Sequence, residues 1–173
     1  MRTFIAIEIP EEVKEQIIEI QKRLPSFKGK LTEKENLHIT LKFLGEINEN
    51  KIEEVKKRLR EIKYQAFDSQ LENLGFFDNP NKGIVLIHLT NCEILQKEID
   101  ERLKDLFFKE KRFMSHLTIA RTKQIKDKQV FLNELNKIKI SPLSFKINEF
   151  NLKESIPMKD KHVYRNLENY KLI

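Results

Sequence analysis

The chain has 173 residues, of which 39% are hydrophobic and only four are Gly and five are Pro. This size and composition predict one packed domain and exclude a largely disordered chain. The single cysteine, Cys92, excludes an internal disulfide and a multi-cysteine metal cluster, and we expect it to be a half-buried structural residue.

The charge balance is modestly basic, because 33 Lys and Arg residues against 27 Asp and Glu residues give a formal net charge of +6. This excess is compatible with an anionic partner such as RNA, and equally with an ordinary Lys/Glu-rich surface in contact with water. The N-terminal residues do not follow the pattern of a signal peptide, and no stretch approaches the length of a transmembrane span. We therefore expect a cytoplasmic protein with no membrane partner.

Periodic apolar residues and turn signals predict alternating strands and helices. In chain order, the first half should contain a strand over 2–9, a helix over 10–24, a loop or short strand over 26–35, a strand over 37–44 and a helix capped by Asn48 or Asn50. The second half should contain strands over 67–77 and 84–89, a helix capped by Thr90 or Asn91, a strand over 114–120, a helix over 127–138, and strands over 143–154 and 162–172. Short turns join several neighbouring strands, which favours an α+β fold with antiparallel sheets over a doubly wound parallel sheet.

A four-residue pattern, His-x-Thr-x with x apolar, occurs twice, at His38–Leu41 and at His116–Ile119. Alternate residues of a strand point to the same face. Each copy therefore places an imidazole and a hydroxyl on one side of its strand, and the aliphatic residues face a core on the other side. The hydroxyl comes from Thr40 in the first copy and from Thr118 in the second.

The two copies are 78 residues apart, and other features repeat at about the same distance. Residues 67–74 fall on 145–152 with Phe, Asn and Leu at matching places, and the apolar strand 4–9 matches 84–89. This pattern predicts a single domain over 1–173 that arose by internal duplication. We expect two lobes that face each other across a cleft, each giving one His and one Thr to a shared site.

Two imidazoles that face each other can divide acid and base catalysis, since an imidazole gains or loses a proton near neutral pH. One can remove a proton from the attacking group while the other protonates the leaving oxygen, and the threonine hydroxyls can bind a phosphate between them. A metal site is the main chemical alternative, but only Glu35 among the Asp, Glu and Cys residues lies within three residues of either motif histidine, and we expect no metal. We expect His88 and His162, which have no Thr two places on, to be partly exposed strand residues.

Two cations follow the motifs and are candidates for substrate binding. Lys42 shares the strand parity of His38 and is therefore a candidate to point into the cleft, with a surface position as an equal alternative. Arg121 has the opposite parity to His116 and reaches the cleft only if the strand ends or bends after Ile119. In the cleft, its guanidinium would be a fixed fork for phosphate.

These motifs and their surroundings resemble the 2H phosphoesterase superfamily, and within it the RNA 2′,3′-cyclic phosphodiesterase family, also called 2′-5′ RNA ligases. The resemblance covers nearly the whole chain. It rests on residues 2–10, on the two motifs with their flanks at 38–46 and 116–121, and on 152–155 with the closing strand that holds Tyr164.

The resemblance implies a bilobal α+β fold, with two lobes related by a pseudo-two-fold axis, antiparallel sheets, helices outside and the active-site cleft between the lobes. It implies hydrolysis of a terminal 2′,3′-cyclic phosphate on RNA, such as a tRNA half, to a 2′-phosphate without a cofactor, and a reversible 2′-5′ joining activity. His38 would be the proton donor and His116 the acceptor, although the residues alone leave this assignment open. Thr40, Thr118 and Arg121 would hold the phosphate, and we expect a monomer.

The chain departs from the family pattern at a few places. Family members often carry an Arg and a Trp in the strand after the Pro-containing turn and a Pro before the second histidine, whereas this chain has no Trp and has Ser115 at the latter place. These departures leave the catalytic set intact and bear on base stacking and substrate preference. Two other functions stay open: a non-catalytic module that binds RNA ends, and a 2H phosphodiesterase for small cyclic nucleotides or 2′-5′ oligonucleotides.

Overall fold

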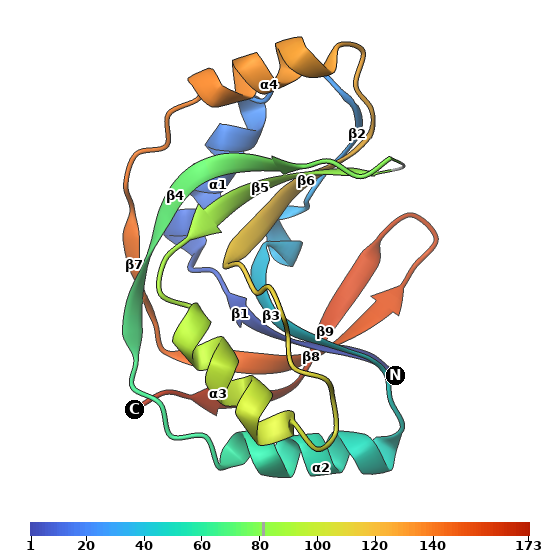
Figure 1. The fold of residues 1–173 in the computed structure, drawn as a ribbon, viewed down its shortest axis with the longest axis vertical. Helices are drawn as coiled ribbons and strands as arrows, with labels where there is room; N and C mark the ends of the chain where they lie inside the picture. The colour runs from blue at the N-terminus through green and yellow to red at the C-terminus, as the bar shows by residue number, and fades with distance from the viewer. Residues whose placement is uncertain (81) are drawn as a thin grey trace.

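The computed structural model describes residues 1–80 and 82–173. Within these residues the chain forms four α-helices and nine antiparallel strands (Figure 1). The strands are β1 Arg2–Glu8, β2 Lys28–Leu31, β3 His38–Glu46, β4 Phe67–Phe77, β5 Gly83–Leu89, β6 His116–Gln124, β7 Ser144–Ile147, β8 Glu149–Pro157 and β9 His162–Lys171. The helices are α1 Glu11–Lys22, α2 Glu49–Arg60, α3 Glu93–Leu103 and α4 Lys128–Lys137, with a short 3-10 helix at Lys34–Asn36. The predicted α+β class is therefore confirmed.

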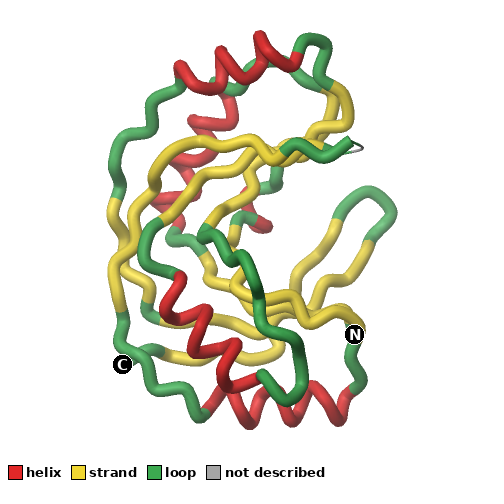
Figure 2. Tube along the Cα trace, viewed as in Figure 1, coloured by secondary structure: helices red, strands yellow, loops and turns green. Residues whose placement is uncertain are grey.

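The strands follow the order β7-β4-β5-β6-β3-β1-β8-β9 across the sheet, and β2 pairs with β6 off this path. The two motif strands, β3 and β6, are neighbours at the centre, and in the described part of the chain they pair only at Ile39 and Leu117. Figure 2 shows the helices at the periphery, with α1 and α4 at one end of the molecule and α2 and α3 at the other. The lobes meet at the junction of β3 and β6.

The first helix of each half packs against the motif strand of the other half. Helix α1 lies against β6, and α3 lies against β3. One hydrophobic cluster accordingly contains residues from both halves, among them Ile17 of α1, Ile39 of β3, Ile99 of α3 and Leu117 of β6. Because each half of the chain buries a helix of the other half, the position of one motif strand is fixed relative to the other.

The helix starts show where local signals succeed and where tertiary contacts override them. Asn48 caps α2 as predicted, since its side chain accepts a hydrogen bond from the backbone N of Lys51. The predicted cap of α3 is wrong, because Cys92 occupies the cap position without a side-chain cap bond. Thr90 instead accepts a hydrogen bond from the backbone N of Gln70, and the Asn91 amide donates to the carbonyl of Asp68, so both are used by strand β4. Asn91 adopts a φ of 69°, the left-handed conformation that Asn tolerates.

The predicted strand over 143–154 is two strands. Strand β7 pairs with β4 and strand β8 pairs with β1 and β9, so the chain crosses from one lobe to the other between them. The region 26–35, for which the sequence allows a loop or a short strand, forms β2 and the 3-10 helix. Among the described residues, no helix is long and apolar enough to cross a membrane.

Each motif strand contains a β-bulge at the last residue of its motif. In β3 the bulged residue without a counterpart on β1 is Leu41, and Leu44 is skipped in the same way further along the strand. In β6 the residue without a counterpart on β5 is Ile119. The burial patterns of the two strands are identical, with two consecutive buried residues at the bulge and an exposed residue after them. Because the extra residue shifts the alternation of side chains by one place, Phe43 and Arg121 come to the motif face, and Lys42 leaves it.

Contacts from the first half of the chain stabilise the bulge of β6. The carbonyl oxygen of Ile119 accepts hydrogen bonds from the backbone N of Thr32 and from Nε2 of Gln21 in α1, both at 2.9 Å. Without these donors a buried carbonyl would lack its strand partner, which costs about 1–3 kcal/mol. The bulge of β6 is therefore an anchored feature of the fold.

The position of Lys42 corrects the prediction that it points into the cleft and binds substrate. Its side chain is 2% exposed, lies 2.5 Å from Oδ1 of Asp100 in α3 and donates to the carbonyl of Phe108 at 2.7 Å. Oδ2 of Asp100 also accepts from Gln96 and from the backbone N of Glu110. The bulge is the physical reason, because it turns Lys42 toward the helix side of β3.

Replacing Asp100 by Asn leaves the Lys42 ammonium buried without its carboxylate. We expect the free energy of unfolding to fall by about 3–5 kcal/mol, the usual cost of breaking one side of a buried ion pair. Urea unfolding followed by circular dichroism measures this. The double variant Lys42→Met/Asp100→Leu removes both charges and should recover much of the loss, and a double variant as unstable as the single one would contradict this interpretation.

Candidate active site

The four motif side chains meet at the junction of β3 and β6. Ile39 and Leu117 are paired there, and in an antiparallel pair the neighbours on either side also lie opposite one another. His38 is therefore placed opposite Thr118, and Thr40 opposite His116. The structure thus brings together the residues that the sequence singles out, in the arrangement that a pseudo-two-fold axis requires.

Both motif imidazoles are held by the same backbone contact. Nδ1 of His38 lies 2.7 Å from the carbonyl oxygen of Asn36, and Nδ1 of His116 lies 2.8 Å from that of Met114. A carbonyl oxygen only accepts, so Nδ1 carries the proton in each neutral ring, and Nε2 is the nitrogen available for proton transfer. Nε2 of His38 also lies 3.0 Å from the hydroxyl of Thr40. The backbone thus holds both rings by Nδ1 and leaves Nε2 for other partners.

His38 is neutral over a wide pH range. Its pKa is lowered to about 4, first by burial and further by the positive charges of Lys153 and Arg121. The carbonyl of Asn36 and the carboxylate of Glu8 oppose this shift but do not outweigh it. In the free protein at neutral pH, Nε2 of His38 is therefore unprotonated.

Aromatic rings surround His38 on the motif face. The rings of Phe4 and Tyr164 each lie 5.2 Å from the imidazole, and Phe4 also contacts Phe43 at 6.2 Å. His162 stacks on Tyr164 at 6.5 Å. Phe43 is 67% exposed although it is a large aromatic residue, so it offers a ring face to a ligand beside His38.

Arg121 lies on the motif face because of the bulge. From the sequence, Arg121 reaches the cleft only if the strand bends after Ile119. The bulge at Ile119 provides that bend. Arg121 is exposed, and its charge reaches His38 across the junction. The side chain is therefore placed to meet an anion bound between the two histidines.

The other two histidines lie on strands β5 and β9. His88 is half-buried and is the cross-strand neighbour of His116 on β5. Its Nε2 lies over Gly75 of β4, where an added Cβ would approach to 2.8 Å. His162 is exposed, and its Nδ1 lies 3.3 Å from the hydroxyl of Ser155. Both are partly or fully exposed strand residues, as expected.

Sequence reasoning missed the residues that β1, β8 and β9 bring to His38. Glu8, Lys153 and Asn166 form a hydrogen-bonded group on the same face, although up to 158 residues separate them in the chain. The alternation in 2–9 places Phe4 and Glu8 on one face, which is a weak signal. Nothing local indicates which strand will lie beside them.

Two further chemical features lie outside the site. Cys92 is fully buried rather than half-buried, and burial raises the pKa of its thiol to about 11, so it is an inert structural residue. In the described part of the chain, no group of three or more His, Cys, Asp or Glu residues is placed to hold a metal ion.

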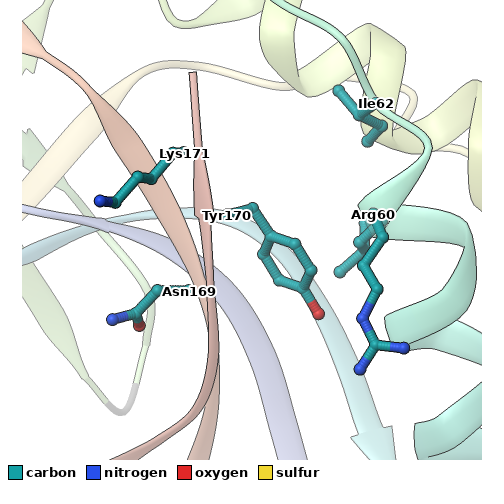
Figure 3. Close-up of a pocket in the computed structure, with 6 residues that line it drawn as sticks. Arg60, Ile62, Asn169, Tyr170 and Lys171 are labelled. Carbon is teal, nitrogen blue, oxygen red and sulfur yellow. The ribbon is translucent and has the colours of Figure 1, made fainter. Parts of the chain in front are cut away.

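A small cavity lies between the end of α2 and β9 (Figure 3). It is lined by Leu59, Arg60, Ile62, Asn169, Tyr170 and Lys171. The Tyr170 ring points toward Arg60, and Arg60 donates two hydrogen bonds to Glu168. No motif residue lines this cavity, so it is separate from the candidate site.

Known proteins resemble the chain over most of its length. A family model described as LigT like Phosphoesterase matches residues 7–86 and 91–164. The RNA 2′,3′-cyclic phosphodiesterase of Methanocaldococcus jannaschii is 41% identical over 143 residues, which cover 80% of this chain and 82% of that protein. The protein of the same name from Archaeoglobus fulgidus is 35% identical over 176 residues and covers 96% of this chain and 98% of its own length.

Solved structures share the fold. The protein TT0787 of Thermus thermophilus superposes with a TM-score of 0.82 at 24% identity and covers 99% of this chain and 97% of that one. E. coli LigT complexed with 3′-AMP superposes with a TM-score of 0.77 at 24% identity and the same coverage. The predicted bilobal fold is therefore confirmed.

The lowered pKa of His38 predicts a pH-dependent stability. Its folded pKa of about 4 lies below the ordinary value of 6.5, so the unfolded chain binds the proton more tightly, and the contribution of His38 falls as the pH drops from about 6.5 to 4. We expect the stability difference between the wild type and His38→Gln to change by up to about 3 kcal/mol over this range. Urea unfolding at a series of pH values measures it, and parallel curves for the two proteins would contradict it.

Proposed function

The chain belongs to the family of LigT-like 2H phosphoesterases, and we propose that it hydrolyses the 2′,3′-cyclic phosphate at an RNA end to a 2′-phosphate, by acid–base catalysis with His38 and His116. The observation that carries this proposal is the pair of His-x-Thr sets at the β3–β6 junction, each with Nδ1 held by a carbonyl and Nε2 left for other partners. The names of relatives up to 41% identical support the substrate.

The proposed reaction is an in-line attack of water on phosphorus. Nε2 of His116 takes a proton from the water, the new P–O bond forms, the P–O3′ bond breaks, and Nε2 of His38 gives its proton to O3′. The products are a 2′-phosphomonoester and a free 3′-hydroxyl, and proton exchange with solvent restores both rings. A 5′-hydroxyl of a second RNA in place of the water gives a 2′-5′ linkage, which is the joining reaction.

The donor role of His38 requires a proton that the free protein does not hold at neutral pH. The cyclic phosphate carries a negative charge, and an anion next to an imidazole raises its pKa. Substrate binding therefore supplies the charge that favours protonation of His38 at the place where the leaving oxygen lies. Thr40, Thr118 and Arg121 hold the phosphate through hydrogen bonds.

The aromatic group beside His38 suits a nucleotide. Bases stack on exposed aromatic rings with little dependence on sequence, and Phe43 offers such a ring next to the proposed phosphate position. The net charge of +6 favours a polyanion. We propose a monomer that acts in the cytoplasm on RNA ends such as those of tRNA halves.

Replacing either histidine by Ala should stop turnover and leave the fold intact. We expect kcat to fall by about 10²–10⁴-fold in each variant, the usual contribution of a general acid or base. An RNA oligomer ending in a 2′,3′-cyclic phosphate is incubated with the protein in excess EDTA, and phosphorus NMR follows the appearance of a 2′-phosphomonoester. Circular dichroism of each variant controls for folding.

Three results would overturn the proposal: undiminished turnover in either variant, activity that appears only with added metal, or a tight complex without product. The last would favour a binding module. Turnover of a mononucleotide or a 2′-5′ oligonucleotide in preference to the RNA would favour another 2H phosphodiesterase.

Replacing Arg121 by Met tests its contact with phosphate. We expect kcat/KM to fall by about 10- to 100-fold, since a hydrogen bond to a charged group contributes about 1.5–3 kcal/mol. The matched control is Arg60→Met, which removes an exposed arginine beside the separate cavity and should leave kcat/KM unchanged. Equal effects of the two substitutions would argue against a direct role for Arg121.

A further inference from the structure

A buried cation lies on the motif face next to His38. Lys153 of β8 is 6% exposed and sits on the face that Phe4 shares with the motif, because it pairs with Phe4 of β1. Its ammonium donates to Oε1 of Glu8 at 2.6 Å and to Oδ1 of Asn166 in β9 at 2.6 Å. The Asn166 amide also donates to the Glu8 carboxylate at 3.3 Å. Three strands thus hold one charge pair in a defined place.

Glu8 links this pair to the candidate site. It is the cross-strand neighbour of His38, so the two side chains lie on the same face of the sheet. Burial alone would raise the pKa of Glu8, but the hydrogen bond and charge of Lys153 outweigh it and hold the pKa of that carboxyl below its usual range. Glu8 is therefore a carboxylate, and it stands between a lysine and an imidazole.

Stability is a weak explanation for this pair. Removing the Lys153 ammonium from water carries a large penalty, and the Glu8 carboxylate that pairs with it is about half exposed, so that solvent weakens their attraction. The two charges instead have opposite effects on the adjacent ring: Lys153 disfavours a proton on His38, and Glu8 favours one.

The other groups that face His38 come from the remaining strands of the site. Arg121 of β6 adds a second positive charge, and Tyr164 of β9 contributes a ring. His162 stacks on Tyr164, and His116 lies across the junction. Glu8 supplies a negative charge that acts on His38 in the opposite direction.

We propose that Lys153 is a positioning residue of the reaction, which adds to the effect of burial in lowering the proton affinity of His38 before an anionic phosphate binds, acting through its own charge and through its ion pair with the carboxylate of Glu8. This inference rests on the proposed function, in which His38 exchanges a proton with the substrate. A structural role alone would require only that the two charges neutralise each other.

The first test is the titration of His38 in the free protein, followed by NMR of the imidazole C–H groups and assigned by the signal that His38→Gln removes. Lys153→Met should raise the pKa of His38 by about one pH unit, and Glu8→Gln should lower it. Lys153→Arg keeps the charge and should leave the titration near that of the wild type. The matched control is Glu154→Gln, which breaks the ion pair with Arg165 on the opposite face of β8 and should not move the titration.

The second test is the pH profile of kcat/KM on the cyclic-phosphate RNA. The pH at which the protonation of His38 changes kcat/KM should rise in Lys153→Met and fall in Glu8→Gln, as in the NMR titration. Lys153→Arg should give a profile close to that of the wild type. If Lys153→Met and Glu8→Gln both fold but leave the titration of His38 unchanged, the inference is overturned. If the protein shows no turnover of the RNA, the proposed function fails, and the NMR titration still decides whether Lys153 and Glu8 set the charge of His38.

Discussion

Each motif strand has an extra residue at the end of its motif, Leu41 in β3 and Ile119 in β6, and this bulge decides which side chains reach the site. Before the bulge, His and Thr share the face as simple alternation requires. After it, alternation is shifted by one place, so that Arg121 turns toward the junction and Lys42 turns toward α3. Straight strands would give the reverse: a lysine in the cleft and an arginine in the core. The composition of the candidate site thus depends on these two bulges.

The bulged strands are stabilised because the first helix of each half of the chain packs against the motif strand of the other half. A bulged carbonyl lacks its strand partner and must find another donor when it is buried. For Ile119 the donors are Gln21 of α1 and Thr32, which belong to the other half of the chain. After the corresponding bulge of β3, Lys42 forms its buried ion pair with Asp100 of α3, again a residue of the other half. Each half therefore completes the motif strand of the other, and the distance between the histidines is set by the packing of both.

The sequence predicts those parts of the site that depend on local alternation. The motif residues, the α+β class and most element boundaries follow from periodicity, and the resemblance to a family adds the bilobal arrangement. The prediction for Lys42 is wrong because a bulge leaves no clear local signal, whereas Arg121 was expected in the cleft only if its strand bends, and the bulge is that bend. Thr90 and Asn91 have the chemistry of helix caps but are used by β4. Lys153 and Glu8 escape prediction because their contact depends on the order of strands in the sheet, which joins residues 145 apart.

Two histidines from a repeated motif begin as equivalents, yet an acid and a base must differ in proton affinity when the substrate is bound. The backbone cannot provide this difference, since both rings use the same contact to a carbonyl two residues earlier. The strands beside them can. Strand β3 is followed in the sheet by β1 and β8, which bring Phe4, Glu8 and Lys153 to the side of His38, whereas β6 is followed by β5, which brings His88 to the side of His116. Burial and positive charge remove the proton from His38 in the free protein, and a bound phosphate would bring the negative charge that restores it. Substrate binding would then favour protonation of the donor. The different strands beside the two histidines, rather than the symmetry of the motifs, would give each histidine its role.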